Sequence, residues 1–256
     1  MRKWLCLLPL FISTLAQAQA QAQAQTIFMA GDSTMSIKEV KDYPETGWGV
    51  PFATFFGDGV KVDNRARNGR STRTFIEEGR WQGIEKALRP GDYVIIQFGH
   101  NDEVEHKTDR YTTPGQYKAN LSRFIRESRA RGARPLLMTP VTRRYFDEEG
   151  KVKHTHPYAA LAREVAAAEK VDFIDMEAIS RDYFQSQGDE ASALRFMHIP
   201  PDTHPNYPNG VRDDTHFNQL GAREVAQLVL RELRKMEHPL AGKLREPDPK
   251  HLTLKY

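Results

Sequence analysis

Short runs of aliphatic and β-branched residues recur along the chain, and they predict strands. The stretches 27–30, 94–96 and 135–138 are continuously apolar. Such runs suit strands that are buried on both faces, as in a parallel sheet covered by helices. Five strands are predicted in all: 26–30, 60–64, 93–98, 134–138 and 171–175.

Apolar residues also recur at helical spacing between and after these strands. The segments with this pattern are 113–131, 156–170 and 218–236. In the last of them, Leu220 and Val225 are expected on the buried face. Strands that alternate with helices indicate an α/β fold. We expect a three-layer α/β/α sandwich, flavodoxin-like, with a parallel sheet of about five strands. Because no internal repeat or linker is visible, residues 26–256 are expected to form one domain.

Two segments do not follow this alternation. Residues 145–154 have a turn-like Glu149-Gly150 between polar flanks, which predicts a small hairpin or a projecting loop. Residues 199–210 are rich in Pro, Asn and Gly, which predicts an ordered loop rather than a helix or strand.

The N-terminus has the pattern of a signal peptide. A basic start, Met1-Arg2-Lys3, precedes an apolar run over 4–15 and the small residues Ala16-Gln17-Ala18. The run is shorter than the ~20 residues that a membrane-spanning helix needs. We expect residues 1–25, which include a Gln-Ala repeat, to be a leader. The mature protein would then be exported to the periplasm or the extracellular space. The alternative is a buried N-terminal helix.

Composition excludes several classes of protein. Lys plus Arg number 37 and Asp plus Glu 34, and loss of Arg2 and Lys3 with the leader would leave 35 against 34. A chain so close to neutral lacks the charge of a general nucleic-acid binder. The only cysteine, Cys6, lies in the predicted leader, so neither a disulfide nor a cysteine nucleophile is expected. No spacing gathers three of the nine histidines, and no metal or other cofactor is expected.

The first candidate for chemistry is Ser33, in the sequence Gly31-Asp32-Ser33-Thr34 directly after the first predicted strand. In an open parallel sheet, ligands bind beyond the carboxyl ends of the strands, so a serine nucleophile would be accessible there. The alternative is that Ser33 is the N-cap of the next helix.

The second candidate is Asp213-Asp214-Thr215-His216, just before the last helix. A serine nucleophile needs a base, and the base needs a group that fixes its tautomer. On a tight turn, Asp213 and His216 could face one another, with Asp214 as a rival for the carboxylate. The alternative is an aspartate that caps the helix beside a solvated histidine.

Two further loops could supply hydrogen-bond donors to an oxyanion. Gly69, in Asn68-Gly69-Arg70-Ser71 after the second strand, allows a backbone N–H to approach a ligand closely. Asn101, after the third strand, offers a carboxamide. Each loop could equally be an ordinary turn from strand to helix.

Together the four blocks resemble those of the SGNH (GDSL-type) hydrolases, over residues 26–236. The resemblance implies that Ser33 is the nucleophile, His216 the base and Asp213 the group that orients it. It also implies an oxyanion hole made of the N–H groups of Ser33 and Gly69 and the side chain of Asn101.

A narrower match is with the rhamnogalacturonan acetylesterases, which remove acetyl groups from pectin. It rests on Gly-Asp-Ser-Thr at 31–34, Phe-Gly-His-Asn-Asp-Glu at 98–103 and Tyr-Pro-Asn-Gly at 207–210. Asn68 departs from it, since many relatives are expected to have a second glycine there. A pectic substrate carries carboxylates, which guanidinium groups bind well, and tyrosine can stack on a sugar. The candidate substrate-binding residues are therefore Arg70, Arg73, Arg143, Arg144 and Tyr207.

The leading hypothesis is therefore a carbohydrate O-acetylesterase whose partner is an acetylated plant cell-wall polysaccharide or oligosaccharide. No nucleic acid, membrane or obligate protein partner is expected. A lipase, lysophospholipase or thioesterase on the same scaffold is the nearest alternative, but residues 200–212 are polar and Pro-rich rather than apolar. A non-catalytic carbohydrate-binding module is a further alternative.

Overall fold

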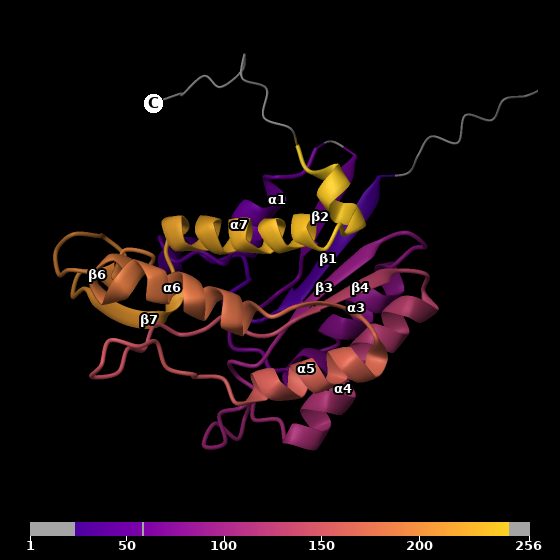
Figure 1. The fold of residues 1–256 in the computed structure, drawn as a ribbon, viewed down its shortest axis with the longest axis horizontal. Helices are drawn as coiled ribbons and strands as arrows, with labels where there is room; N and C mark the ends of the chain where they lie inside the picture. Colours follow the sequence, from indigo (N-terminus) through magenta and orange to yellow (C-terminus); the bar gives the residue numbers. More distant parts are fainter. Residues whose placement is uncertain (1–23, 58, 246–256) are drawn as a thin grey trace, which may run out of the picture.

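The computed structural model describes residues 24–57 and 59–245, so residues 1–23 of the predicted leader lie outside the described residues. Gln25, the last residue of the predicted leader, is already the first residue of a strand, which places the start of the folded chain one residue earlier than expected. Its main sheet has five parallel strands in the order β2-β1-β3-β4-β5, which confirms the expected fold class (Figure 1). Each predicted strand is present to within two residues. The strands are β1 (Gln25–Gly31), β2 (Val60–Asn64), β3 (Tyr93–Gln97), β4 (Arg134–Met138) and β5 (Asp172–Ile174).

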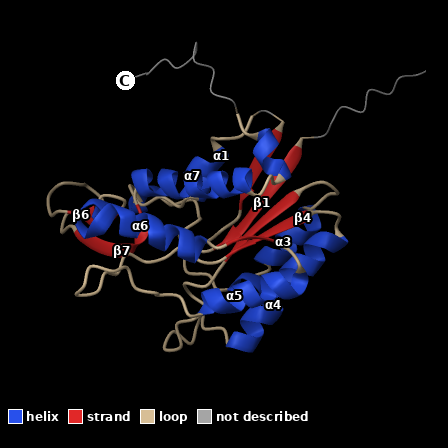
Figure 2. Ribbon diagram, in the orientation of Figure 1, coloured by secondary structure: helices blue, strands red, loops and turns tan. Residues whose placement is uncertain are grey.

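Helices cover both faces of this sheet, as Figure 2 shows. The three predicted helices are α4, α5 and α7, and the others have no counterpart in the predictions. The helices are α1 (Gly49–Ala53), α2 (Thr72–Glu77), α3 (Arg80–Ala87), α4 (Pro114–Ala130), α5 (Tyr158–Glu169), α6 (Met176–Ala193) and α7 (Gln219–Lys235), with short 3-10 helices η1 (Val40–Asp42) and η2 (Pro239–Lys243).

The alternation of side chains along β1 divides the core into two layers. Ile27 and Met29 point to the cluster that α1, α6 and α7 cover, whereas Phe28 and Ala30 point to the cluster under α2 to α5. Because both sides of the strand are covered, its apolar run is continuous. Leu220, however, is exposed, which corrects the predicted buried face of α7.

Local sequence signals set the ends of α4. Thr113 is its N-cap and forms a capping box with Gln116, and Pro114 occupies the first turn. Pro is favoured there because the first N–H groups of a helix have no partner within it. The chain leaves the helix at Gly132, whose φ of 73° suits glycine.

A second, two-stranded sheet was not predicted. It pairs β6 (Phe196–Ile199) with β7 (Val211–Phe217) in antiparallel fashion. The register jumps, so that the adjacent residues Phe196 and Met197 face Phe217 and Asp213. Asp213 and His216 therefore lie in an irregular strand rather than on a tight turn before the last helix, which corrects the expectation.

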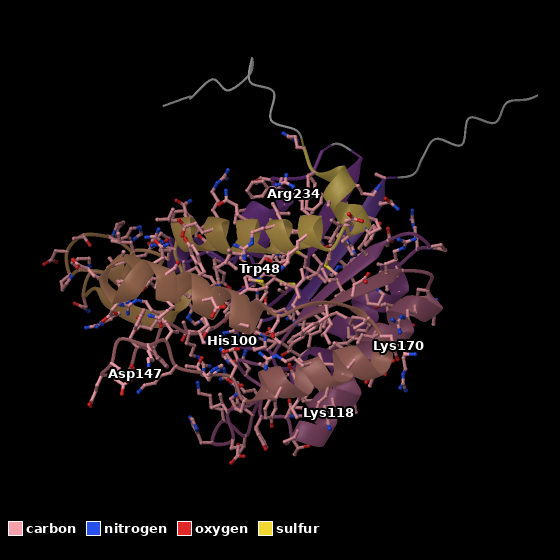
Figure 3. The ribbon with its side chains drawn as sticks, in the orientation of Figure 1. Trp48, His100, Lys118, Asp147, Lys170 and Arg234 are labelled. Carbon is pink, nitrogen blue, oxygen red and sulfur yellow. The ribbon has the colours of Figure 1, made fainter. Side chains whose placement is uncertain are left out.

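The two irregular segments match their predictions. Residues 145–154 form a hairpin in which Phe146 bridges to Val152, and Asp147 marks its projecting end in Figure 3. Residues 200–210 form a loop without helix or strand, whereas Ile199, the first residue of the predicted loop, is the last residue of β6. The hydroxyl of Tyr207 donates to the carbonyl of Asp42, which anchors this loop to the segment that contains η1.

The strand order determines where a ligand can bind. It reverses between β1 and β3, because β2 lies beyond β1 on one side and β4 beyond β3 on the other. In open α/β sheets, ligands bind at such a reversal, beyond the carboxyl ends of the strands. Within the described residues, no helix combines the length and the apolar character needed to cross a membrane.

Candidate active site

Ser33 lies in the turn that follows β1, at this reversal. The N–H groups of Met35 and Ser36 both donate to the carbonyl of Asp32, so the chain turns without forming a helix at Ser33. The alternative that Ser33 is a helix N-cap is therefore wrong. The fully buried carboxylate of Asp32 accepts from the N–H and the hydroxyl of Thr34 and stabilises the turn.

The structure brings Ser33, His216 and Asp213 into one hydrogen-bonded row. Ser33 Oγ lies 2.8 Å from His216 Nε2. On the other side of the ring, Nδ1 lies 2.6 Å from Asp213 Oδ2. A residue 183 positions away is thus in direct contact with the serine. With Nδ1 protonated and bound to Asp213, Nε2 is free to accept the proton of the hydroxyl.

The environment of Asp213 favours its charged form. Burial raises its pKa, but hydrogen bonds from the ring of His216 and from the N–H groups of Thr215 and His216 outweigh this and hold it at about 2. Asp213 does not cap α7, because Asn218 is the N-cap there. The neighbouring Asp214 bonds instead to Arg144 and His198.

Gly69 and Asn101 line the same pocket as Ser33 and His216. Gly69 has a φ of 75°, in the left-handed region that favours glycine. Asn101 donates one amide hydrogen to the carbonyl of Arg70 at 3.1 Å. Since a carboxamide has two hydrogens, the second is available to a ligand.

His100 contacts the carboxylate of Asp32, which stabilises the turn at Ser33. Its Nδ1 lies 3.1 Å from Asp32 Oδ2, and Figure 3 labels it between α6 and α5. Burial lowers the pKa of His100 to about 4, so the ring is neutral at neutral pH and donates to Asp32 through Nδ1. For Asp32, burial raises the pKa, but bonds from His100 and Thr34 hold it at about 2.

The pocket beside Ser33 has a volume of about 350 Å³. Apart from Gly69, every residue that lines it has a polar or charged side chain. The lining consists of Ser33, Glu45, Asn68, Gly69, His100, Asn101, Lys107, Arg110, Arg143, Thr215 and His216.

Sequence reasoning predicted Arg143 in this lining but missed Lys107 and Arg110. Both lie in the loop that follows Asn101, and the position of that loop after a central strand was the only available signal. The Glu45 carboxylate is the one acidic group among the lining residues, and it pairs with Lys38 at 2.6 Å.

The other predicted substrate-binding residues lie elsewhere. Arg144 is buried and bonds to Asp214, Ser192 and Asp189. Arg73 donates to the carbonyls of Tyr111 and Thr108 and to the carboxylate of Glu77. Arg70 pairs with Glu78 and borders an adjoining hollow, and Tyr207 does not line the pocket beside Ser33.

Trp48 is a core residue. It is fully buried, and its ring N–H donates to Gln97 at 2.6 Å.

Among residues 24–57 and 59–245, no three His, Cys, Asp or Glu side chains are grouped so that they could hold a metal ion.

Fold and site together define an ester hydrolase of a known class. Residues 29–224 match the sequence profile of the GDSL-like lipase/acylhydrolase family, and the chain belongs to this family. This confirms the family that the four blocks indicated.

Individual relatives have names that state a narrower activity than the family does. Rhamnogalacturonan acetylesterase RhgT from Bacillus subtilis (strain 168) is 42% identical over 223 residues, 85% of this chain and 93% of that protein. Probable rhamnogalacturonan acetylesterase YesY from the same strain is 36% identical over 219 residues, 84% of this chain and 94% of that protein. The crystal structure of YxiM from Bacillus subtilis superposes with a TM-score of 0.72 at 29% identity, covering 84% of this chain but 57% of that one.

Proposed function

We propose that this protein is an exported carbohydrate O-acetylesterase that removes acetyl groups from rhamnogalacturonan. The observation that carries the proposal is the row Ser33–His216–Asp213, with distances of 2.8 Å and 2.6 Å, at the wall of a polar pocket. The two relatives named for this activity supply the substrate class.

In the first half of the reaction, Ser33 Oγ attacks the acetyl carbonyl carbon while His216 Nε2 takes the hydroxyl proton. The negative oxygen that forms accepts hydrogen bonds from the N–H groups of Ser33 and Gly69 and from the side chain of Asn101. Each such donor typically lowers the barrier by about 3 kcal/mol. The bond to the sugar oxygen then breaks, and His216 returns the proton to it.

In the second half, His216 takes a proton from water as the water attacks the acetyl-serine. The bond to Ser33 Oγ breaks, the proton returns to the serine, and the product leaves as acetic acid, which ionises to acetate in water. Asp213 keeps Nδ1 protonated throughout and stabilises the imidazolium each time it forms. Both halves use the same row of atoms.

The lining of the pocket favours a short acyl group. A long acyl chain needs an apolar groove, whereas the side chains around Ser33 are polar or charged. This observation argues for an acetylesterase over a lipase or thioesterase. The complete row of serine, histidine and aspartate likewise argues against a module that only binds sugar.

The charge of the pocket favours an acidic polysaccharide. Lys107, Arg110 and Arg143 line it, and the carboxylate of Glu45 is already paired with Lys38. Arg110 and Arg143 also pair with acidic groups outside the lining, Asp109 at 3.1 Å and Glu103 at 3.5 Å, so the positive charge of the pocket is partly balanced. Cations still outnumber carboxylates among the lining residues, and a galacturonate carboxylate can bind to them. Of the arginines predicted from the sequence, only Arg143 is retained in this role.

Acetate release tests the proposal. Acetylated rhamnogalacturonan and acetylated xylan are compared with wild type and Ser33→Ala, and the same enzyme is assayed with acetate and octanoate esters of one chromophore. We expect acetate from rhamnogalacturonan, preference for the acetate ester and a loss of about four orders of magnitude in the variant. Preference for octanoate, or activity that survives in Ser33→Ala, would contradict the proposal.

A further inference from the structure

A buried ammonium group lies directly behind Ser33, and the mechanism above does not use it. The side chain of Lys38 is 3% exposed. Its Nζ donates to the main-chain oxygen of Ser33 at 2.5 Å and to Oδ1 of Asn68 at 2.8 Å, and it lies 2.6 Å from Oε1 of Glu45. An ammonium has three hydrogens, and here each has an acceptor.

One of these acceptors connects Lys38 to the base. The same Oε1 of Glu45 lies 4.0 Å from His216 Nε2, the nitrogen that faces Ser33 Oγ. Glu45 also lines the pocket, and its side chain is 17% exposed. Oε1 of Glu45 thus lies between the buried ammonium of Lys38 and Nε2 of His216, the nitrogen that takes the proton from Ser33.

Another acceptor connects Lys38 to the oxyanion loop. Asn68 directly precedes Gly69, and its Oδ1 accepts from Ser36 Oγ at 2.5 Å as well as from Lys38. Because the third bond of Lys38 goes to the carbonyl of Ser33, one ammonium links the nucleophile turn to the loop of Gly69. This gives Asn68, the departure from the expected second glycine, a structural role.

We infer that Lys38 and Glu45 form a positioning pair for the proposed reaction. Lys38 fixes the position of the turn that carries Ser33 relative to the loop that carries Gly69. Glu45 stabilises the imidazolium that forms at His216, and Lys38 limits that effect by neutralising the carboxylate. The inference rests on the proposed function, because it assigns roles relative to that chemistry.

The electrostatic part depends on every charge near His216. Asp213 binds the far side of the ring, and Glu45 approaches Nε2. The remaining cations of the pocket come from the loops after β3 and β4: Lys107, Arg110 and Arg143. His100, on the loop after β3, is neutral at neutral pH because burial lowers its pKa to about 4.

The charge of Lys38 in turn depends on its acidic neighbours. Burial lowers the pKa of the ammonium, whereas the charges of Glu45, Asp32 and Asp42 raise it. Removing Glu45 takes away the strongest of these opposing influences. The two members of the pair therefore cannot be understood separately, and the test must vary both.

Single variants with opposite effects test the pair. Glu45→Gln removes the carboxylate near Nε2, so we expect the acid limb of kcat/KM against pH to move down by about one pH unit. Lys38→Met leaves that carboxylate unpaired, so the limb should move up by a similar amount. Lys38→Met should also lower kcat about ten-fold, with KM for a small acetate ester nearly unchanged, because Lys38 does not line the pocket.

The double variant separates the two roles. Without either charge, the acid limb should return close to wild type, while kcat stays low because the link between Ser33 and Asn68 is lost. The exposed pair of Lys118 and Glu164, at 3.1 Å, provides the matched control. Lys118→Met and Glu164→Gln should leave both the acid limb and kcat unchanged.

A second readout does not need activity. The NMR titration midpoint of the His216 ring should move down in Glu45→Gln and up in Lys38→Met, as the acid limb does. If Lys38→Met does not fold, Glu45→Gln alone provides the test. Folded variants whose midpoint and acid limb both stay within about 0.2 pH units of wild type would overturn the inference. Opposite midpoint shifts in a protein that cleaves no acetate ester would instead contradict the proposed function and support the electrostatic role of the pair.

Discussion

Two adjacent carboxylates in β7 have different partners, and this difference assigns their roles. Asp213 lies 2.6 Å from the ring of His216 and also accepts from backbone N–H groups. Asp214 turns away and lies 2.6 Å from the guanidinium of Arg144 and 2.8 Å from His198. The sequence left both open as the partner of the base, and the geometry favours Asp213.

Isosteric variants of the two aspartates test this assignment. Asp213→Asn should lower kcat about 10⁴-fold, because the amide no longer holds the ring in the required tautomer. Asp214→Asn should retain at least about a tenth of the activity but unfold more easily, because it leaves the buried guanidinium of Arg144 with one anionic partner fewer. Equal losses of kcat in the two variants would argue against the assignment.

Asp32 links the nucleophile turn to acid stability. Its pKa in the folded protein, about 2, lies below the ordinary 3.8, although burial by itself raises it. A carboxyl group whose pKa is lower in the folded protein than in the unfolded chain stabilises the fold at pH values above its unfolded pKa. This contribution is lost as the pH falls through its folded pKa. The window for Asp32 is therefore about pH 4 down to pH 2.

Urea unfolding at a series of pH values measures this contribution. Wild type should lose about 2 kcal/mol between pH 4 and pH 2 that Asp32→Asn does not lose, and the variant should be less stable at pH 7. Asp182→Asn, at a side chain that is 77% exposed, should keep the pH dependence of wild type. Parallel curves for wild type and Asp32→Asn would contradict the role given to this carboxylate.

At the scale of elements, the approach of α7 to β6 places the strand that carries His216. Gly221, in the first turn of α7, lies directly against the carbonyl of Arg195, and a Cβ there would collide with that oxygen. The N–H of Asn218, the N-cap of α7, donates to the same carbonyl at 3.1 Å. The start of α7 is thus fixed by a contact that only glycine permits.

Substitution of two helical glycines tests this contact. Gly221→Ala should lower the free energy of unfolding by about 2–3 kcal/mol, because the collision is with backbone and cannot be relieved by a rotamer change. Gly115→Ala in α4, where the added Cβ meets nothing within 4 Å, should be neutral or stabilise by up to about 1 kcal/mol. Chemical denaturation of both variants checks the difference, and equal effects would contradict it.

The main sheet was predictable because its strands are marked locally by continuous apolar runs such as Val94-Ile95-Ile96. The pair β6 and β7 was not, since β7 reads as a mostly polar segment and its pairing with β6 is non-local. Helix α6 was also missed. Its sequence is largely polar, and Gly188 interrupts it with a φ of 74°.

The same distinction applies to the site. Ser33, Gly69, Asn101 and His216 belong to short motifs, so their meeting at one pocket could be anticipated. The same holds for Asp213, which does not line the pocket but bonds to His216. Lys38, Glu45 and Arg110 carry no motif, and their nearness depends on the path of loops. Arg144 shows the converse, because a loop arginine expected to bind substrate is buried in contacts with acidic groups.

At the scale of the whole molecule, charge is local rather than general. The chain has a formal net charge of only +3, yet three cationic side chains line the pocket beside Ser33. An acidic polymer and a neutral ester should therefore respond differently to changes in the pocket's charge.

Export and the extension of the domain to residue 256 remain predictions, since residues 1–23 and 246–256 lie outside the described residues.

Arg110 is the clearest test of this difference between polymer and ester, since its acidic partner, Asp109, is 67% exposed. Arg110→Gln should raise KM for acetylated rhamnogalacturonan about 3- to 10-fold and leave KM for a small neutral acetate ester nearly unchanged. Arg110 also donates to Oδ1 of Asn101 at 3.5 Å, so any loss of kcat through that bond should be the same for both substrates. The control Arg231→Gln, on α7, should change neither. Added salt should raise KM for the polymer in wild type and less so in Arg110→Gln. Equal KM changes for polymer and ester would contradict substrate recognition by charge.

The central claim is that Ser33 becomes acylated and that His216 makes this possible. Peptide mapping after treatment with a fluorophosphonate measures it directly, because such a reagent reports an activated serine by a covalent adduct. The account predicts one adduct, on Ser33, that is absent from Ser33→Ala and lost in His216→Ala. An enzyme that releases acetate but carries the adduct on another residue, or an adduct on Ser33 that persists in His216→Ala, would contradict it.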